Sequence, residues 1–448
     1  MKIRDDAGAW VDEEFETLDL GDPRRDRRAK ELVKRFASRP TASIPGACEG
    51  WSETIAAYRF LGNEHIDWRD MMQPHWERTT ARMGQLPVVL CIADTTELNF
   101  NGQDIEGAGP LCYEAQVGMY LHATYAVTPD REPLGVMNAW MWAREPRDAN
   151  GKRGGVKESA RWIESYEIVA EQARALPDTR LVYVADREGD IAALMQRAQE
   201  LGEPADWLMR SQHNRALKGE ASLWETVHAS KVLGHISFVL PGRNGQKARE
   251  VRQELRSQRV TLPGRAGVKL TCVEAYEVDA PAGVKPVIWR LVTNREAGDA
   301  HALIELVDWY RARWEIEMFF NVLKNACGVE ALQLSQMERV EKALVLYMVV
   351  SWRIARLMRV GRTCPELNAS LFFAADEIHG AHVLCKKARP KKPPTLNQMI
   401  RMVGSLGGFL GRKSDGEPGA KTLWIGMQRV MDAVITIQIL RDGYDTCV

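Results

Sequence analysis

The segment Val88-Val89-Leu90-Cys91-Ile92-Ala93-Asp94 decides the fold of this chain, because an apolar run there ends directly in a carboxylate. Such a run is typical of a short, fully buried strand. The segment Leu181-Val182-Tyr183-Val184-Ala185-Asp186 repeats the pattern further along the chain. A buried strand is an expensive place for a lone negative charge. Two such carboxylates at strand ends therefore predict a shared functional site.

The residues around these two segments predict a mixed sheet. Residues 120–127 and 134–142 form two further predicted strands, joined as a hairpin by a turn at Pro129-Asp130. A helix is predicted over residues 157–176, and it leads back to the strand that ends at Asp186. Strands followed by a helix and a strand predict an α/β fold with helices on the faces of the sheet. Later strands are predicted at residues 236–240, 251–262, 268–278 and 287–293.

Four polar side chains share one face of a helix that is predicted over residues 300–326, with Asp299 as its N-cap. They are Tyr310, Arg313, Glu317 and Lys324. At about 100° per residue, their positions fall within roughly 60° of one another on the helical wheel. Glu315 lies at about 140° and is expected to face away. The shared face suits a site that holds a metal ion and binds phosphate oxygens, although a solvated face with ordinary ion pairs has the same pattern.

Asp94, Asp186 and Glu317 together form a candidate metal site. Three carboxylates can hold magnesium, or alternatively manganese, through oxygen ligands. Two such ions, about 3.5–4 Å apart, can stabilise the attacking and leaving oxygens of an in-line phosphoryl displacement. Taken singly, Asp94 could instead be a turn or cap residue before Thr95, and Asp186 a helix cap or an ion-pair partner of Arg187.

These acidic residues and the pattern Y-x2-R-x3-E-x6-K around Glu317 resemble the bacterial DDE cut-and-paste transposases of the insertion-sequence-four group, in its transposon-five-like branch. Other short motifs agree with this resemblance, which spans most of the chain. They are Leu20-Gly21-Asp22-Pro23-Arg24-Arg25, Ala57-Tyr58-Arg59-Phe60, Ala93-Asp94-Thr95-Thr96, Asp186-Arg187-Glu188-Gly189-Asp190, Arg313-Trp314 and Leu406-Gly407-Gly408-Phe409. The segments 101–113 and 363–394 match no motif of the family.

The resemblance implies a fold and a reaction. The fold is a ribonuclease-H-like catalytic core in which the two aspartate strands are neighbours, with a β-rich insertion before the glutamate helix. In the reaction, water first nicks one strand at the transposon end. The freed 3′-hydroxyl attacks the opposite strand to give a hairpin, water reopens the hairpin, and the 3′-hydroxyl is joined to target DNA. Transposon-end DNA and target DNA are the expected partners, with a homodimer in the synaptic complex.

The resemblance also implies DNA contacts near the site. Trp289 matches a tryptophan that stacks on a base flipped out of the duplex, and Arg210 matches a DNA-contacting arginine. Tyr310, Arg313 and Lys324 are expected to bind phosphates around that nucleotide. Stacking would offset the few kcal/mol, roughly, that unpairing costs. Trp289 could equally be packed in its strand, and Trp314, beside the helix face, could contact DNA or belong to the core.

The distribution of charge favours nucleic acid as a partner more than the formal net charge of zero does. Residues 21–40 hold eight Lys or Arg against three Asp or Glu, and residues 210–269 hold twelve against four. Basic patches on a neutral protein bind the duplex backbone by releasing counterions, although they could also be ordinary solvated surfaces. The expected N-terminal phosphate contacts are Arg24, Arg25, Arg27, Arg28, Lys30 and Lys34.

The chain divides into five predicted segments. Asp22 is a good N-cap and Pro23 a good first residue for a basic helix that stops before Pro40. A second helix, from about Glu53 to Leu61, ends at Gly62. The segments are a helical DNA-binding domain (1–75), the first part of the core (76–205), the β-rich insertion (206–298), the second part of the core with the glutamate helix (299–360) and a C-terminal helical domain (361–448).

The C-terminal part is predicted to be helical and to contribute to dimerisation. Residues 340–358 are strongly apolar and are expected to pack on the core. Residues 422–440 carry apolar side chains at spacings of three and four, which suit either an intramolecular core or a dimer contact. The resemblance favours the dimer contact, because a transposase holds two transposon ends. The stripe consists of Trp424, Met427, Val430, Met431, Val434 and Ile437.

Composition indicates a cytoplasmic protein, and the resemblance implies a bacterial one that associates with the nucleoid when bound to DNA. No run approaches the eighteen or so apolar residues that span a membrane, and the N-terminus leads into no signal peptide. The eight cysteines are scattered without a C-x2-C pair, which argues for reduced thiols and against a zinc site. Two alternatives to a transposase stay open: a ribonuclease-H-like structure-specific nuclease without strand transfer, and a DNA-binding regulator that does not cut.

Overall fold

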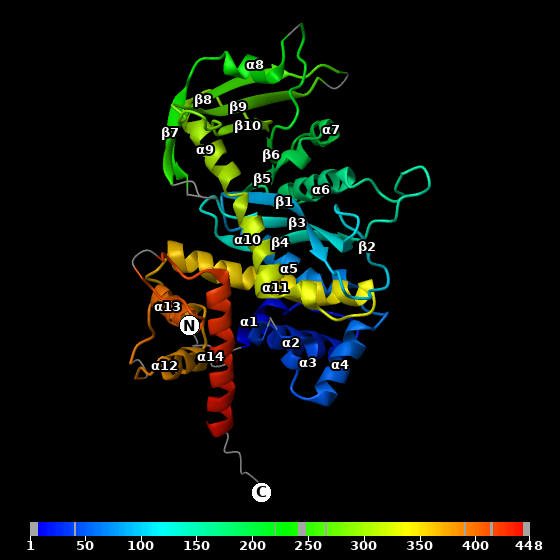
Figure 1. The fold of residues 1–448 in the computed structure, drawn as a ribbon, viewed down its shortest axis with the longest axis vertical. Helices are drawn as coiled ribbons and strands as arrows, with labels where there is room; N and C mark the ends of the chain where they lie inside the picture. The colour runs from blue at the N-terminus through cyan, green and yellow to red at the C-terminus, as the bar shows by residue number, and fades with distance from the viewer. Residues whose placement is uncertain are drawn as a thin grey trace.

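The structure, a computed structural model, describes residues 8–39, 42–219, 221–240, 248–264, 267–388, 391–412 and 415–441. Parts of the predicted terminal domains, residues 1–7 and 442–448, therefore lie outside it. In the described chain the strands form one sheet of ten, flanked by helices (Figure 1). The strands are β1 (Val88–Asn99), β2 (Gly109–Pro110), β3 (Val117–Val127), β4 (Pro133–Trp142), β5 (Arg180–Ala185), β6 (Asp206–Arg210), β7 (Gly234–Leu240), β8 (Arg249–Thr261), β9 (Lys269–Val278) and β10 (Ile288–Thr293).

The strand order explains how the sequence builds one continuous sheet. It runs β2-β3-β1-β5-β6-β10-β9-β8-β7, and β4 pairs with β3. The parallel strands β1, β5 and β6 form the centre, as the apolar segments predicted. The predicted hairpin of β3 and β4 is confirmed, and so are the four strands of the insertion. The insertion extends the central sheet, because β10 pairs with β6 on one side and with β9 on the other.

The prediction that both aspartates stand at strand ends is half correct. β5 ends at Ala185, directly before Asp186. β1 instead continues past Asp94 to Asn99, so Asp94 lies in the middle of its strand. The reason is the antiparallel partner: β3 keeps pairing with β1 through this half, as far as the pair Asn99 and Gly118.

Helices cover both faces of the sheet. α6 (Ser159–Ala175), which confirms the helix predicted over 157–176, and α7 (Ala192–Glu200) pack on one face. α9 (Ala300–Arg311), α10 (Trp314–Asn321) and the long α11 (Met337–Thr363) lie on the other face (Figure 1). Phe319 of α10 stacks on Tyr125 of β3, with ring centroids 4.7 Å apart. This contact fixes α10 against the centre of the sheet, where Asp94 lies.

The helix predicted over residues 300–326 is not continuous, and this part of the prediction is wrong. α9 begins after Asp299, whose side chain accepts a hydrogen bond from Ala302 N as an N-cap. At the junction with α10, backbone bonds run from residue i to residue i−3, for example from Arg313 N to Tyr310 O (3.0 Å). Such a tight turn rotates the following residues relative to α9. A π-helical turn, Val322–Ala326, then carries Lys324.

The N-terminal part is helical, as predicted. It contains α1 (Ala9–Glu14), α2 (Pro23–Ser38), α3 (Ile44–Ala47), α4 (Trp51–Leu61) and α5 (Trp68–Met83). The Asp22 side chain accepts a hydrogen bond from Arg24 N, which confirms the predicted N-cap of α2. Phe36 of α2 stacks on Tyr347 of α11 at 4.6 Å, so this unit packs against the core. α5 runs across residue 75, where the predicted boundary falls.

A buried polar network joins the N-terminal helices to the sheet. His75 Nε2 accepts a hydrogen bond from Val136 N (3.0 Å), so Nδ1 carries the proton and donates to Glu14 Oε1 (2.5 Å). Burial lowers the pKa of His75, which keeps the ring neutral. Arg82 makes two hydrogen bonds of 2.9 Å to Glu14 and supplies the compensating charge. Burial raises the pKa of Glu14, but the bonds and charges of His75 and Arg82 outweigh it and hold the pKa at about 2.

Glu14→Gln is expected to destabilise the protein at neutral pH by about 3 kcal/mol, because it leaves Arg82 without its partner. The folded-state pKa of Glu14 is depressed, so its contribution is present above the unfolded value of 4.5 and is lost as pH falls through about 2. Urea denaturation of the parent and the variant between pH 2 and 7 measures this difference. A gap in unfolding free energy that stays constant over that range would contradict the assignment.

The C-terminal part consists of α12 (Ala375–Leu384), α13 (Leu396–Leu406) and α14 (Ala420–Arg441), packed on the end of α11. Trp424, Val430 and Val434 of the predicted apolar stripe are buried within the chain. The interpretation of these three side chains as a dimer contact is therefore wrong. α14 packs on α12 and α13, and Trp424 and Val434 also line a cavity between α14 and α2.

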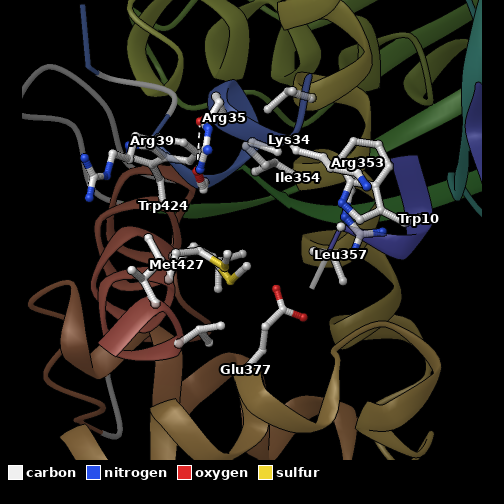
Figure 2. Close-up of a pocket in the computed structure, with 18 of the residues that line it drawn as sticks. Trp10, Lys34, Arg35, Arg39, Arg353, Ile354, Leu357, Glu377, Trp424 and Met427 are labelled. Carbon is white, nitrogen blue, oxygen red and sulfur yellow. Dashed lines mark hydrogen bonds between the residues drawn. The ribbon is translucent and has the colours of Figure 1, made fainter. Parts of the chain in front are cut away.

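A cavity of about 630 Å³ separates α14 from the N-terminal helix α2, with α11 and α12 completing its walls. Figure 2 shows Met427 on one side of this cavity and the Glu377 carboxylate pointing into it. Arg39 of α2 forms an ion pair of 3.2 Å with Asp432 of α14. The two terminal parts of the chain thus face each other across a partly apolar space. No helix in the described ranges is long and apolar enough to cross a membrane.

Candidate active site

Asp94 lies on the face of the sheet that α10 covers, and its side chain is only 16% exposed. Its Oδ1 accepts a hydrogen bond from Thr95 N (2.8 Å). Burial raises the pKa of Asp94, as do the charge of Asp186 and, less strongly, that of Glu317. Arg313 and the hydrogen bond from Thr95 lower it, and the net pKa is about 7. The three predicted carboxylates are therefore close enough to repel one another. A cation bound beside Asp94 would further favour its ionised form.

Asp186 is brought to Asp94 by the pairing of their strands. β1 and β5 are parallel, and Ala93 is opposite Ala185, so the two aspartates follow at the same level of the sheet. Asp186 Oδ1 also accepts a hydrogen bond from Glu188 N (2.8 Å), which caps the 3-10 helix that follows. The alternative role as a cap is thus present. The alternative ion pair with Arg187 is not found in the part of the chain that the structure describes.

Arg313 bridges two of the three carboxylates. Its Nη1 lies 2.9 Å from Asp94 Oδ2, and its Nη2 forms an ion pair with Glu317. The guanidinium is only 12% exposed. It stands between a strand residue and a helix residue, which it holds together by charge-assisted hydrogen bonds.

The oxygens of the three carboxylates are suitable ligands for a divalent ion, but in this structure the Arg313 guanidinium contacts two of the carboxylates. Carboxylate oxygens are the ligands that Mg²⁺ and Mn²⁺ prefer. Among the described residues, no group of three His, Cys, Asp or Glu side chains converges to ligand spacing. The contact of Arg313 with Asp94 and Glu317 accounts for this spacing. Binding of an ion by these carboxylates therefore requires Arg313 to leave them.

Tyr310 and Arg210 extend the site along the sheet. Tyr310 is 7% exposed and lies beside Arg210 at the end of β6. Burial raises the pKa of Tyr310, opposed by the charges of Arg313 and Arg210, and the charge of Asp186 raises it further. The phenol is therefore close to Asp186 and to both arginines. It stays protonated and can donate a hydrogen bond to an anionic ligand.

The other residues of the predicted helix face are divided. Glu315 faces away, as predicted, and lies 3.8 Å from Arg359 of α11. Trp314 is 51% exposed, which excludes the alternative that it belongs to the core. Burial lowers the pKa of Lys324, while Glu330 and Glu97 raise it, so Lys324 stands beside those two acids. Tyr310 thus lies beside Arg313, which contacts Glu317, whereas Lys324, in the π-helical turn, lies beside Glu330 and Glu97.

Trp289 is half-buried in β10, as the packed alternative anticipated, and its ring stacks on Phe238 of β7 at 5.4 Å. Its role with DNA remains a prediction.

Three of the six predicted N-terminal phosphate contacts form ion pairs, and among these Arg24 is the most exposed, at 87% of its side chain. Arg25 donates to Leu20 O (3.1 Å). The ion pairs are Arg24 with Asp22, Arg28 with Glu31 and Lys34 with Asp12. Within the described ranges Arg27 and Lys30 form no ion pair.

The sequence did not single out several residues that adjoin the site. Arg187 and Asp190 belong to the motif after the second strand, which was quoted only as a resemblance. Arg290 stands next to Trp289 and points to the other face of the sheet, because successive strand residues alternate. A signal was present: residues 186–190 place three acids and an arginine directly after a buried strand. It could not reveal which segments these side chains contact.

Comparisons with protein families match three parts of the chain. Residues 7–66 match a family described as transposase DNA-binding, and residues 155–352 match a transposase DDE domain. Residues 349–446 match the transposase Tn5 dimerisation domain. Asp186 and Glu317 fall inside the DDE match, whereas Asp94 precedes it. Asp94 joins the site through the pairing of β1 with β5.

A comparison with solved structures gives a distant similarity. The cryo-EM structure of a piggyBac transposase synaptic complex with hairpin DNA aligns with a TM-score of 0.38 and 9% sequence identity. The alignment covers 98% of this chain and 81% of that one.

Proposed function

We propose that this chain, a DDE transposase related to Tn5 by its three domain matches, cleaves transposon ends and joins their 3′-hydroxyls to target DNA at Asp94, Asp186 and Glu317. A single observation carries the proposal. Three acidic side chains from β1, β5 and α10 lie close enough for the other two to raise the pKa of Asp94. Gathering like charges in a mostly buried position costs stability, and such clusters are typical of functional sites.

The proposed cofactor is Mg²⁺, with Mn²⁺ as a substitute, held by the three carboxylates. Bound divalent ions would stabilise the attacking and leaving oxygens of an in-line displacement. The protein's own groups then have separate roles. Arg313, once released from Asp94 and Glu317, binds a phosphate oxygen, and Tyr310 donates a hydrogen bond beside it. No covalent protein nucleophile is required, so the attacking group is water or a DNA 3′-hydroxyl.

The proposed course of reaction is a nick, a hairpin, reopening of the hairpin and joining to target DNA. All four steps are in-line phosphoryl transfers, so one site serves them in turn. The core is proposed to be ribonuclease-H-like, and the chain is proposed to belong to the insertion-sequence-four group. The pairing of β3, β1, β5 and β6, with the two aspartate strands adjacent, supports this assignment.

The proposed partners are transposon-end DNA, bound first by the N-terminal helices, and target DNA. The segment boundaries at residues 75, 205, 298 and 360 are also part of the proposal. The match of residues 349–446 to a dimerisation domain supports a homodimer in the synaptic complex. Since Trp424, Val430 and Val434 are buried within the chain, the dimer contact is expected to use other faces of the C-terminal helices.

A strand-transfer assay tests the proposed function. A duplex that carries the terminal repeat and ends in a free 3′-hydroxyl is incubated with the full chain, Mg²⁺ and a supercoiled plasmid. The expected product is the duplex joined to the plasmid, and Asp186→Asn gives none. Cleavage of the uncut duplex without any joining would identify a structure-specific nuclease instead. Binding without either product would identify a non-cutting regulator.

A further inference from the structure

The described residues enclose a pocket of about 320 Å³ next to Asp186, which we call the arginine pocket. Its size is at the lower end of the range for ligand sites, roughly 300–1,000 Å³. No carboxylate belongs to its described lining. The lining consists of Arg187, Arg210, Ser211, Gln212, Trp224, Ile288 and Arg290.

A buried acid organises the wall of this pocket. Asp190 is 1% exposed and follows the 3-10 helix that Asp186 caps. Its Oδ2 accepts hydrogen bonds from Gln212 N (2.7 Å) and His213 N (3.1 Å). Its carboxylate also pairs with Arg215, at 2.7 Å. Asp190 therefore ties the segment after β6 to the segment after β5, and so fixes Gln212 relative to the catalytic candidate Asp186.

The opposite wall is fixed by Trp224 and Arg290. Trp224 Nε1 donates to Ser211 Oγ (3.0 Å). The Arg290 guanidinium lies over the Trp224 ring at 4.8 Å and pairs with buried Glu274 at 2.8 Å. Because Glu274 holds one side of the guanidinium, its other donors are kept in a defined direction. These two walls are thus preorganised, and the exposed side chain of Arg187 completes the lining.

The positive charge of the pocket is not fully neutralised. Arg187 is exposed and has no ion pair in the described part of the chain. Arg210 likewise forms no ion pair within the described ranges and lies beside the neutral Tyr310, and Arg290 has one acidic partner. Guanidinium groups match phosphate oxygens in geometry as well as in charge. The chemistry therefore points to a phosphate group as the ligand.

We propose that the arginine pocket is a phosphate subsite for a strand of the transposon-end DNA, and that Asp190 is its positioning residue. The proposal rests on the proposed function, because only then does a DNA strand lie across Asp186. Arg187 of the pocket directly follows Asp186, and Arg210 lies beside Tyr310. A strand bound at Asp186 therefore reaches the pocket at the end of β6. Arg187 and Arg290 then hold a phosphate of that strand, next to the one that reacts.

The test is DNA binding without cleavage. The affinity of the full chain for a fluorescent duplex with the terminal repeat is measured in EDTA at several KCl concentrations. Arg187→Gln is expected to weaken binding roughly 5- to 10-fold and to reduce the slope of log affinity against log salt by about 0.9, since one phosphate contact is lost. Arg197→Gln, which removes the same charge from an exposed ion pair on α7, is expected to leave the slope unchanged. If Arg187→Gln and Arg197→Gln give the same slope of log affinity against log salt, the proposal is overturned.

Asp190 is tested by coupling. Asp190→Asn keeps the size of the side chain but removes the charge that holds Arg215. If Asp190 positions the pocket, Asp190→Asn alone reduces the slope as Arg187→Gln does, and the double variant shows no further reduction. Thermal midpoints of the same proteins separate this effect from unfolding. A lower midpoint with an unchanged slope would assign Asp190 a structural role only.

Free phosphates share the chemistry of a DNA strand, so a second titration separates the sources. Deoxyadenosine monophosphate and inorganic phosphate are added to the DNA-free protein. A DNA strand is supported as the ligand if both small phosphates bind weakly while Arg187→Gln changes the slope of log DNA affinity against log salt. The proposal is overturned if the protein binds the mononucleotide tightly and saturably, Arg187→Gln abolishes that binding, and the slope of log DNA affinity against log salt does not change. Both measurements are independent of metal and cleavage, so failure here leaves the proposed function standing.

Discussion

Asp94→Asn is expected to reduce metal-dependent cleavage of a terminal-repeat duplex by roughly 1,000-fold or more, equivalent to about 4 kcal/mol of transition-state stabilisation. The variant keeps the shape of the side chain and its contact with Thr95, but loses one negative charge of the proposed ligand set. Gel separation of cleaved ends at fixed Mg²⁺ measures the effect.

The same substitution is expected not to lower the thermal midpoint, and this contrast distinguishes a functional acid from a structural one. Burial and the charge of Asp186 raise the pKa of Asp94 to about 7. Its ionised form is thus unfavourable in the folded protein, and a neutral amide relieves that cost. Asp178→Asn, at an exposed position before β5, serves as the control and should cleave normally. If Asp94→Asn cleaves as well as the parent, the assignment of the site is wrong.

Arg313→Gln is expected to have opposite effects on metal binding and on catalysis. In the DNA-free protein its guanidinium contacts Asp94 and Glu317, so it competes with a cation for the same oxygens. Removing it should raise Mn²⁺ affinity about 10-fold, or about 1.4 kcal/mol. Cleavage should fall by roughly 100-fold, because the group that positions the phosphate is lost. Mn²⁺ titration followed by electron paramagnetic resonance measures the first effect, and the cleavage assay the second.

The natural control is Arg311→Gln. Arg311 lies two residues earlier, at the end of α9, and its ion pair of 3.5 Å with Asp308 lies outside the carboxylate cluster. Arg311→Gln removes the same charge as Arg313→Gln from nearly the same place, but no contact with the carboxylates, so it should change Mn²⁺ affinity little. If Arg311→Gln and Arg313→Gln raise the affinity equally, general charge accounts for the effect, and the specific contact of Arg313 does not.

Apolar patterning predicts the strands of this protein well because each is buried on both faces or alternates clearly. It does not predict where β1 ends, since the residues after Asp94 are polar and are held in the strand by β3. It also does not predict the break between α9 and α10. No glycine or proline marks that break, and residues 312–313 keep helical dihedral angles. The i to i−3 bonds that shift the register coincide with the contacts of Arg313, which arise only in the folded chain.

The candidate site was predictable to the extent that it depends on residue type and strand order. Three acids in series, and an arginine four residues before the glutamate, were visible in the sequence. The contact of Arg313 with Asp94 was not, because it joins residues from distant segments. The role of Asp190 was hidden for the same reason, since its partners lie in the segment after β6. The stripe on α14 shows the converse error: regular spacing cannot tell a buried intramolecular face from an exposed one.

The most direct test of the central claim is a crystal structure of the full chain with a terminal-repeat duplex and Mn²⁺, examined for anomalous scattering. The account predicts Mn²⁺ peaks within bonding distance of the Asp94, Asp186 and Glu317 oxygens, with Arg313 moved onto a phosphate. It is contradicted if DNA occupies the site while Arg313 still bridges Asp94 and Glu317 and no peak lies among the three carboxylates.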